Sequence, residues 1–244
     1  MTENHNLKTI AIIPCAGSGV RMGAGRAKQF LEIRDMPILA LTLERFQACR
    51  LIDGITLVVP MAEIEFCKKE IVGKYGFDKV ERVVPGGERR QDSVRMGLQA
   101  SGSDCDVVVI HDGVRPFIDT SLIERAIMAS KEYRAVITAL PAKDTVKKVD
   151  QAGFVTETCE RKDIWLVQTP QVFRFKDIMH AHEKAVSEGW NDVTDDASLV
   201  ERLGIPVKVI TGSEYNIKIT TPHDMALGRI FVDKTGKGED TACC

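Results

Sequence analysis

The chain has 244 residues, of which 44% are hydrophobic and 28% are charged, and its formal net charge at pH 7 is −2. This composition is typical of a globular protein, and so small a net charge gives no general attraction to nucleic acid or to an anionic membrane. No apolar run approaches the roughly 20 residues that span a bilayer, and the first residues lack the basic-then-apolar pattern of a signal peptide. We therefore expect a cytoplasmic protein that binds neither nucleic acid nor a membrane.

Short β-branched runs alternate with amphipathic stretches along the chain. The runs that we interpret as buried strands are Thr9–Ile13, Gly54–Pro60, Val80–Val84, Asp106–Ile110 and Ala135–Ala139. Apolar residues with helical spacing follow Pro37 and recur from Leu122 to Ile127. Strands that are apolar on both faces and are separated by helices predict a Rossmann-like, three-layer α/β fold with a mostly parallel twisted sheet. Ligands of such sheets bind at the carboxyl ends of the strands, so the residues after each strand are the candidate site.

One segment interrupts this alternation. Residues 143–162 carry few apolar side chains among many charges, and Asp150-Gln151-Ala152-Gly153 is typical of a hairpin turn. We expect a protruding β-arm over about residues 141–163, which is either a solvent-exposed hairpin or an arm that clasps a partner subunit. No linker or repeat divides the chain, so we expect a single domain over residues 1–233 and a flexible C-terminal tail over residues 234–244.

A glycine-rich loop follows the first predicted strand. It begins Cys15-Ala16-Gly17-Ser18-Gly19, and its glycines allow backbone N–H groups to face an anion. Arg21 and Lys28 add two cations, which suits a triphosphate with its metal. The glycine spacing differs from the dinucleotide fingerprint, and the Gly-Lys-Ser/Thr of a Walker A loop is lacking. Glycines alone would fit an ordinary tight turn, but glycines with two cations favour phosphate binding.

This loop resembles the nucleotide loop of the nucleotidyltransferases that activate sugars and sugar alcohols. Arg21-Met22-Gly23, followed by Lys28-Gln29-Phe30-Leu31, is similar to the 2-C-methyl-D-erythritol 4-phosphate cytidylyltransferase family of isoprenoid precursor biosynthesis. The resemblance implies a nucleotidyltransferase fold and the transfer of CMP from CTP to the phosphate of 2-C-methyl-D-erythritol 4-phosphate. Cys15 stands where alanine is common and Ala27 where proline is common, which concerns the rigidity of the loop rather than its charges.

Two motifs extend the resemblance to the nucleotide side of the site. The segment Gly86–Val94 resembles G-G-x-x-R-x-x-S-V, which implies that Gly87, Arg90 and Ser93 approach the cytosine and the ribose; a capped surface helix would have a similar sequence. After the fourth strand, His111–Pro116 resembles H-D-A-x-R-P, with Gly113 as a departure from the usual alanine. The resemblance places Asp112 near the nucleotide and its metal, and Arg115 on the substrate side. A helix-capping aspartate is the alternative reading of Asp112.

Four more motifs match the acceptor side of the family's site. The resemblance implies that Thr145 and Arg161 reach from the arm into the partner subunit's site, so that the enzyme works as a homodimer, although an arginine on a charged hairpin is usually just solvated. Thr169, in the segment after a short Trp165–Val167 strand, would line the same pocket. Thr194 is a candidate N-cap beside the acceptor. Asn216–Pro222 reads as a strand whose Lys218 lies at the reacting phosphates, or alternatively points outward.

The implied chemistry needs cations more than it needs a base. A phosphate monoester is already anionic at neutral pH, so it can attack the α-phosphorus of CTP without a strong general base. We expect Arg21 and Lys28 to stabilise the transition state and the leaving pyrophosphate, and Arg161 and Lys218 to orient the acceptor phosphate. A divalent cation, normally Mg²⁺, would be held mainly by phosphate oxygens, with Asp112 as the candidate protein ligand.

Three other functions fit part of the pattern. Ribitol-5-phosphate cytidylyltransferases share the glycine loop, but the segment Gly86–Val94 and the threonine three residues before Arg161 favour methylerythritol phosphate. A dinucleotide-dependent oxidoreductase requires an acidic residue at the end of the second strand, which here ends in Val59-Pro60. A catalytically silent nucleotide sensor would be expected to lack one of the cations Arg21, Lys28 and Lys218, and all of them are present.

Overall fold

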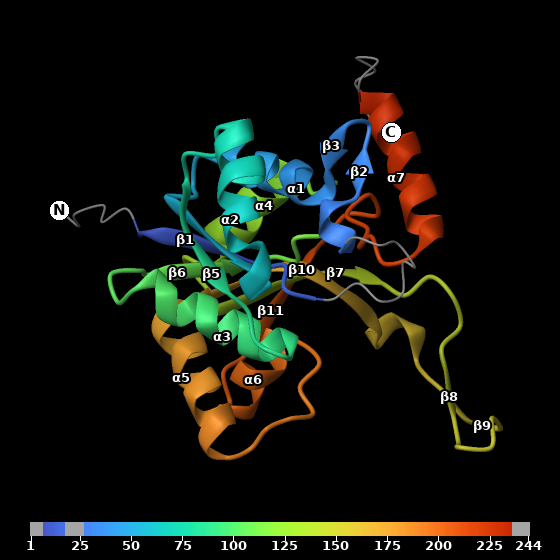
Figure 1. Ribbon diagram of the computed structural model, residues 1–244. Coiled ribbons are helices and arrows are strands. Elements are labelled where there is room, and N and C mark those ends of the chain that lie inside the picture. The colour runs from blue at the N-terminus through green and yellow to red at the C-terminus, as the bar shows by residue number, and fades with distance from the viewer. Residues whose placement is uncertain (1–6, 18–26, 236–244) are drawn as a thin grey trace.

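The computed structural model describes residues 7–17 and 27–235 (Figure 1). The candidate residues Ser18, Gly19 and Arg21, and residues 236–244 of the predicted tail, lie outside these ranges. The described residues form a seven-stranded sheet in the order β11-β7-β10-β6-β1-β4-β5. Its strands are β1 (Thr9–Pro14), β4 (Gly54–Val59), β5 (Val80–Pro85), β6 (Val107–Ile110), β7 (Ala135–Pro141), β10 (Trp165–Arg174) and β11 (Val207–Thr211).

The sheet is mostly parallel, as the sequence predicts. β1 pairs in parallel with β4 and β6, β4 with β5, and β7 with β11. β10 is the exception, because it runs antiparallel to both β6 and β7. The Rossmann-like α/β expectation is therefore confirmed, with one reversed strand inserted next to β6.

Helices cover both faces of the sheet (Figure 1). One face carries α1 (Ile38–Ala48), α4 (Thr120–Ala129) and the short α2 (Ile64–Phe66), which continues as the π-helix Cys67–Gly73. The other face carries α3 (Arg90–Ser101), α5 (Phe175–Ser187) and α6 (Asp196–Arg202). Short 3-10 turns lie at Lys28–Phe30, Met61–Glu63 and Arg161–Asp163.

Strand β1 shows why both faces need a helix layer. Ala11 and Ile13 pack in the cluster that contains α1 and α4, whereas Ile10 and Ile12 pack in the cluster that contains α3, α5 and α6. All four side chains are at most 1% exposed. Successive strand residues point to opposite faces, so a fully apolar strand is stable only between two apolar layers. None of the described helices has the length and apolar character needed to cross a membrane.

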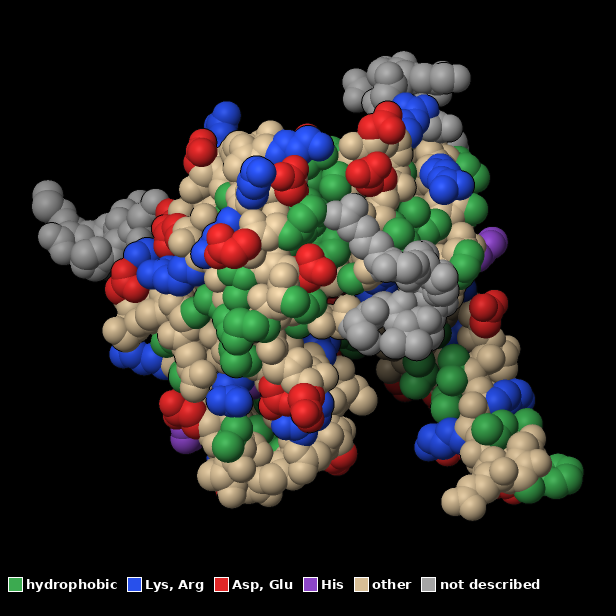
Figure 2. All heavy atoms as spheres, in the orientation of Figure 1, with side chains coloured by type: hydrophobic (Ala, Val, Ile, Leu, Met, Phe, Trp, Pro, Cys, Tyr) green, Lys and Arg blue, Asp and Glu red, His purple; other side chains and the backbone are tan. Residues whose placement is uncertain are grey.

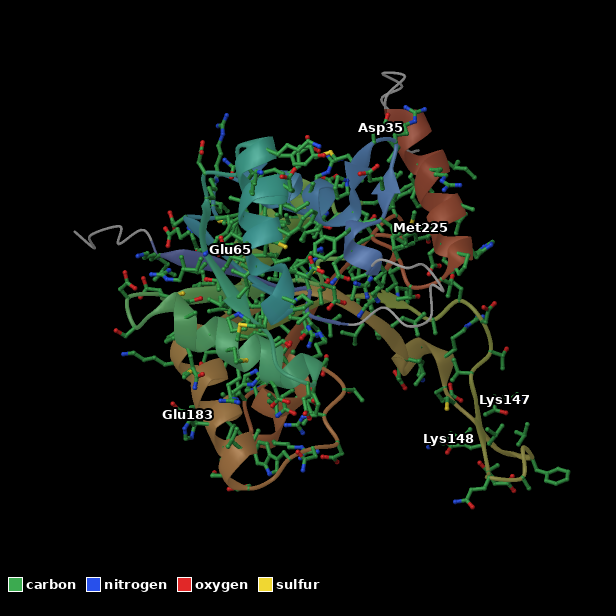
Figure 3. The ribbon with its side chains drawn as sticks, viewed as in Figure 1. Asp35, Glu65, Lys147, Lys148, Glu183 and Met225 are labelled. Carbon is green, nitrogen blue, oxygen red and sulfur yellow. The ribbon has the colours of Figure 1, made fainter. Side chains whose placement is uncertain are left out.

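A smaller unit packs beside the carboxyl ends of the strands. It consists of the β2–β3 hairpin (Glu32–Ile33 and Met36–Pro37) and α7 (Pro222–Thr235). Met225 of α7, labelled in Figure 3, joins Ile33, Ile38 and Ile219 in a third apolar cluster. This cluster holds the segment before α7 against the edge of the sheet where ligands are expected.

The β-arm predicted from the sequence is present as a hairpin. Its strands are β8 (Lys147–Val149) and β9 (Val155–Thr158), and every residue in both is exposed. The turn contains Gly153 at a φ of +85°, a backbone conformation that favours glycine. Figure 2 shows the arm standing off the body of the molecule, and Figure 3 labels Lys147 and Lys148 on it. The scarcity of apolar residues in this segment therefore reflects a hairpin without a core of its own.

The strand predicted at Trp165–Val167 is longer in the structure. The strand is β10 and continues to Arg174, so the Gln168–Gln171 segment lies inside it rather than after it. The register shifts between Gln168 and Gln171, around Pro170, which has no N–H to give to a ladder. A proline in a polar segment resembles the end of a strand in the sequence, whereas in the structure the ladder resumes on its far side.

The prediction of a strand at Asn216–Pro222 is also wrong. No strand is assigned there, and the backbone groups of this segment find partners in loops and at a helix start. Ile219 N donates to Val114 O, and Thr220 N and Thr221 N both donate to the side chain of Asp224 in α7. The alternating pattern of the sequence is real, but caps and loops satisfy the hydrogen bonds that a sheet would otherwise supply.

Candidate functional site

A pocket opens where the loops after β1 and β6 meet the start of α3. Its volume is about 160 Å³, and we call it the strand-end pocket. Its lining includes nine candidates from the sequence: Cys15, Ala16, Gly17, Lys28, Gly87, Arg90, Ser93, Asp112 and Lys218. Because β1 is paired in parallel with both β4 and β6, the loops after these strands open at the same edge of the sheet. The topology thus brings four distant motifs to one place.

The carboxylate of Asp112 lies at the centre of the charged groups in this pocket. Its Oδ1 is 3.1 Å from Arg90 Nε, and its Oδ2 is 2.8 Å from Lys218 Nζ and 3.4 Å from Arg115 Nε. Burial alone would raise the pKa of Asp112, but the three cations outweigh it and hold that pKa well below its usual range. Asp112 is therefore an ionised group that is shared by three basic side chains. Its alternative reading as a simple helix cap does not describe these contacts.

Buried amides hold the segment that carries Lys218. Asn216 is fully buried, and its backbone carbonyl accepts a hydrogen bond of 2.7 Å from Arg115 Nη1. Gln168 of β10 donates from Nε2 to Ser213 O at 2.8 Å, and its Oε1 accepts from Ser213 N at 3.2 Å. Lys218 therefore contacts Asp112 from a loop that hydrogen bonds fix to the antiparallel strand β10.

His111 and Thr169 fix the loop of Asp112 from below. Asp112 N donates to Thr169 Oγ1 at 3.1 Å, and that oxygen lies 3.0 Å from His111 Nδ1. His111 Nε2 lies 3.2 Å from Arg115 O, which can only accept, so Nε2 carries the proton and Nδ1 accepts from the threonine hydroxyl. Burial lowers the pKa of His111 to about 3. The imidazole is therefore a neutral structural link.

Glycines at the other wall of the pocket allow backbones to come close. A Cβ added to Gly86 would lie 2.2 Å from the Cβ of Ala16, and one added to Gly87 would lie 2.5 Å from the Cβ of Asp92. Gly87 N donates to Ser93 Oγ at 3.2 Å. The segment before α3 thus packs directly on the start of the glycine loop, which only small residues permit.

The residues after the glycine loop fold back onto its beginning. Lys28 opens a 3-10 turn and lines the strand-end pocket. The neighbouring Gln29 is 1% exposed and donates from Nε2 to Cys15 O at 2.8 Å. Phe30 is buried in the core next to it. These contacts position Lys28 at the end of the loop that follows β1. The sequence analysis assigned a role to this lysine but none to the glutamine.

The two departures at Cys15 and Gly113 are neighbours in space. A Cβ added to Gly113 would lie 2.7 Å from Cys15 Sγ and 3.1 Å from Ile13 Cγ2. The sulfur at position 15 therefore occupies the space that a methyl group at position 113 would need. Burial raises the pKa of the Cys15 thiol well above its usual range, so it stays a neutral, space-filling group.

The candidate acceptor residues are not gathered in this pocket. Thr145 and Arg161 are exposed on the arm, and Arg161 Nη1 donates to Lys143 O at 2.8 Å. Thr169 is 5% exposed and supports the Asp112 loop from beneath. Within one chain, the strand-end pocket therefore contains mainly the residues expected around the nucleotide.

The prediction that Thr194 caps a helix is wrong. Thr194 is exposed, and the residue that caps α6 is Asp195, whose Oδ1 accepts from Ser198 N at 3.1 Å. The next residue, Asp196, is 1% exposed and lies 2.7 Å from Arg90 Nη1. The sequence contains two successive carboxylates at this helix start, but nothing in it distinguishes the exposed cap from the buried partner of an arginine. Asp196 is therefore a residue that sequence reasoning missed.

Metal-binding groups are sparse in the described part of the chain. Within residues 7–17 and 27–235, no three His, Cys, Asp or Glu side chains are grouped so that they could hold a metal ion. In the strand-end pocket, the oxygens of Asp112 already face cations. The donor set fits a metal that is carried by phosphate oxygens rather than one held in a protein cage.

Comparison with known proteins gives one consistent family. The family model of IspD, 2-C-methyl-D-erythritol 4-phosphate cytidylyltransferase, matches residues 9–234. Proteins of that name from Geobacter metallireducens and Geotalea uraniireducens are 48% and 49% identical to the chain. Each alignment covers 93% of the chain, and 98% and 97% of the respective relative.

Solved structures agree with these matches. The structure of 4-diphosphocytidyl-2C-methyl-D-erythritol synthase from Anaerococcus prevotii has a TM-score of 0.83 and 35% sequence identity, and the match covers 93% of the chain and 97% of that protein. The cytidylyltransferase structure from Francisella tularensis has a TM-score of 0.77 and 32% identity, covering 91% of the chain and 99% of that protein. The likeness therefore extends over more than nine-tenths of the chain.

The contact between Cys15 and position 113 predicts a compensating pair of substitutions. Gly113→Ala should lower the free energy of unfolding by about 1–3 kcal/mol, because the new methyl group overlaps the sulfur in a packed core. Adding Cys15→Ala should restore at least half of that loss, since it removes the sulfur at 2.7 Å and leaves only the 3.1 Å contacts with the Cβ of residue 15 and with Ile13 Cγ2. Urea denaturation of the wild type, both single variants and the double variant measures this. Equal losses from Gly113→Ala in both backgrounds would contradict it.

The buried neutral His111 predicts a stability that falls in mild acid. The folded-state pKa of about 3 is below the usual unfolded value of about 6.5, so the unfolded chain binds the extra proton first as the pH falls. His111 alone should therefore lower the free energy of unfolding by about 2 kcal/mol between pH 6.5 and pH 5. Urea denaturation at several pH values in this range should show that the free energy of unfolding of His111→Gln depends less steeply on pH than that of the wild type. The exposed His180→Gln is the matched control, and an identical slope for all three proteins would refute the assignment.

Proposed function

Because the chain belongs to the 2-C-methyl-D-erythritol 4-phosphate cytidylyltransferase family, we infer that it transfers CMP from CTP to 2-C-methyl-D-erythritol 4-phosphate. The products are 4-diphosphocytidyl-2-C-methyl-D-erythritol and pyrophosphate, and the reaction belongs to isoprenoid precursor biosynthesis. The observation that carries this function is the match of the family over nearly the whole chain. None of the relatives reported above supports the ribitol-5-phosphate alternative. We also propose that the enzyme works in the cytoplasm, where CTP is available.

The reaction is an in-line displacement at the α-phosphorus of CTP. An oxygen of the acceptor phosphate forms the new P–O bond, the bond to the bridging oxygen breaks, and pyrophosphate leaves with the electron pair. The acceptor oxygen is already anionic, and His111 is neutral and fully enclosed, so we propose no general base. Catalysis then depends on positioning and on cations that face the growing negative charge.

We assign that positive charge to Lys28 and Lys218, together with Arg21 from the glycine loop. Lys28 and Lys218 both line the strand-end pocket. Of the three cations on Asp112, Lys218 has the most exposed side chain, at 37%, compared with 30% for Arg90 and 12% for Arg115. Lys218 can therefore turn from Asp112 toward a phosphate with the least rearrangement, while the arginines stay in place. Gly17, Gly87 and Ser93 would receive the nucleotide beside them.

A divalent cation, normally Mg²⁺, is proposed to enter with the triphosphate. Asp112, one of the two carboxylates that line the strand-end pocket, could join the phosphate oxygens as a ligand once Lys218 has turned away. When bound, the cation would neutralise part of the charge on the phosphates. The residues of the chain itself would bind the base, orient the phosphates and hold the acceptor.

The acceptor half of the site is proposed to be completed by a second copy of the chain. Thr145 and Arg161 are exposed on the arm, as are the apolar side chains Val149, Phe154 and Val155. Three consecutive apolar residues at the start of β10 are also at least 40% exposed: Trp165, Leu166 and Val167. A homodimer would cover these surfaces and bring Arg161 to the partner subunit's pocket, beside its Arg115, Thr169 and Thr194.

Pyrophosphate release tests the reaction and the role of Lys28. With CTP and Mg²⁺, release should require 2-C-methyl-D-erythritol 4-phosphate and should not occur with ribitol 5-phosphate. Lys28→Ala should lower kcat by about 100-fold with an unchanged circular dichroism spectrum, because it removes one preorganised cation from the transition state. The exposed Lys69→Ala is the matched control. Release with ribitol 5-phosphate alone would overturn the acceptor, and near-normal turnover of Lys28→Ala would overturn that residue's role.

Mixed dimers test whether the arm acts on the partner subunit. Lys28→Ala and Arg161→Ala subunits, carrying different tags, are co-expressed and the mixed dimer is purified through both tags. If the arm works across the dimer, one of the two sites contains both wild-type residues, and the mixed dimer should have about half the wild-type activity. If the arm serves its own subunit, both sites are defective and activity stays at the level of the parents. Failure to recover any mixed species would contradict the dimer itself.

A further inference from the structure

Arg90 is held by two carboxylates on opposite sides of its guanidinium group. It is the first residue of α3 and lines the strand-end pocket. Its Nε lies 3.1 Å from Asp112 Oδ1, and its Nη1 lies 2.7 Å from Asp196 Oδ2. Asp112 is a pocket residue, whereas Asp196 is not among the residues that line the pocket. The second carboxylate therefore contacts the nucleotide site only through the arginine.

Asp196 is an unusually buried ionised group. Its side chain is 1% exposed, and it lies at the start of α6 against α5. Burial alone would raise its pKa, but Arg90 and, after it, His182 outweigh this and hold the pKa of Asp196 below its usual range. His182 of α5 is also fully buried, and its Nε2 lies 3.2 Å from Asp196 Oδ1. A carboxylate so placed is stable only with a permanent cation beside it.

The surrounding contacts fix Asp196 in position. The preceding residue, Asp195, caps α6 and accepts a hydrogen bond of 2.7 Å from Gln171 Nε2 in β10. The start of α6 is thereby fastened to the sheet, so Asp196 presents its carboxylate from a rigid site. By contrast, an arginine side chain loses about 2 kcal/mol of rotamer freedom when it is ordered, and it needs such a fixed partner to keep one direction.

Competition for Asp112 makes the second partner necessary. Arg90, Arg115 and Lys218 all contact the two oxygens of Asp112. If Asp112 were the only anion, each cation would be oriented by a group that it shares with two others. Asp196 gives Arg90 a second anion, which contacts Nη1, whereas Asp112 contacts Nε.

We propose that Asp196 is a positioning residue for nucleotide binding, which acts by fixing the Arg90 guanidinium at the wall of the strand-end pocket. The proposal rests on the proposed nucleotide site, because it requires Arg90 to contribute to CTP binding. It assigns a function to the buried layer of α5 and α6, which does not itself reach the substrate. The expected consequence concerns affinity for CTP more than the rate of the bound complex, since Asp196 does not line the strand-end pocket.

The test compares Asp196→Asn with Asp192→Asn, an exposed aspartate on the same segment that pairs with Arg202. Asp196→Asn should raise the Kd of CTP by about tenfold while kcat at saturating CTP changes by less than about threefold. Asp192→Asn should leave both unchanged. A kcat that falls as much as the affinity, or an unchanged Kd in a folded Asp196→Asn protein, would overturn the proposal.

A double-mutant cycle separates positioning from a general effect on the fold. Arg90→Gln removes the charge and keeps much of the side chain. In that background, Asp196→Asn should cause no further loss of CTP affinity, because the group through which it acts is gone. An equal additional loss would mean that Asp196 supports the fold rather than Arg90. If Arg90→Gln itself leaves the Kd of CTP unchanged, the place of Arg90 in the proposed nucleotide site fails instead.

A conservative variant covers the case in which Asp196→Asn does not fold. Asp196→Glu keeps the negative charge beside Arg90 but displaces it by about one methylene group. It should fold and lose less CTP affinity than Arg90→Gln. A folded Asp196→Glu protein with a loss as large as that of Arg90→Gln would show that the buried charge does not orient the arginine, and would overturn the proposal.

Discussion

Three basic side chains from distant parts of the chain converge on the carboxylate of Asp112. Arg90 begins α3, Arg115 follows β6 in the same loop as Asp112, and Lys218 precedes α7. Without a buried anion, these cations would repel one another in the pocket, and without the cations the anion would be too costly to bury. This mutual dependence holds the loop after β6, the start of α3 and the segment before α7 in one arrangement. The remaining features of the site are supports for that arrangement.

The supports belong to two classes. Hydrogen bonds fix the direction of the charged groups: the neutral His111 and Thr169 hold the Asp112 loop, and Gln168 holds the segment of Lys218. Small residues fix the separation of the loops, because Gly86 lies against Ala16 and Gly113 lies against Cys15. Together they form a pocket whose cations already point inward before a nucleotide arrives. Such preorganisation would serve the proposed reaction, which uses no general base.

Local patterns in the sequence were sufficient for the layers of the fold. The apolar runs gave β1 and β6 correctly, because strands covered on both faces leave a continuous β-branched signal that does not depend on their partners. The reversal of β10 and its passage beyond Pro170 were not predictable, since strand direction and register are decided by pairing with β6 and β7. The segment around Lys218 resembled a strand because its apolar and polar residues alternate. Whether a neighbouring strand pairs with such a segment is not visible in the sequence.

The sequence by itself determined which glycines and cations lie together in the strand-end pocket, because the residues that follow parallel strands lie at one edge of the sheet in any fold of this class. The family likeness supplied the acceptor. Only the tertiary structure decided how these charges are balanced, since Asp196 and Gln29 acquire their roles from burial and from partners that are remote in sequence. The electrostatic cost of burying a charge depends on the groups that surround it in space, and these groups come from residues that are distant in the sequence.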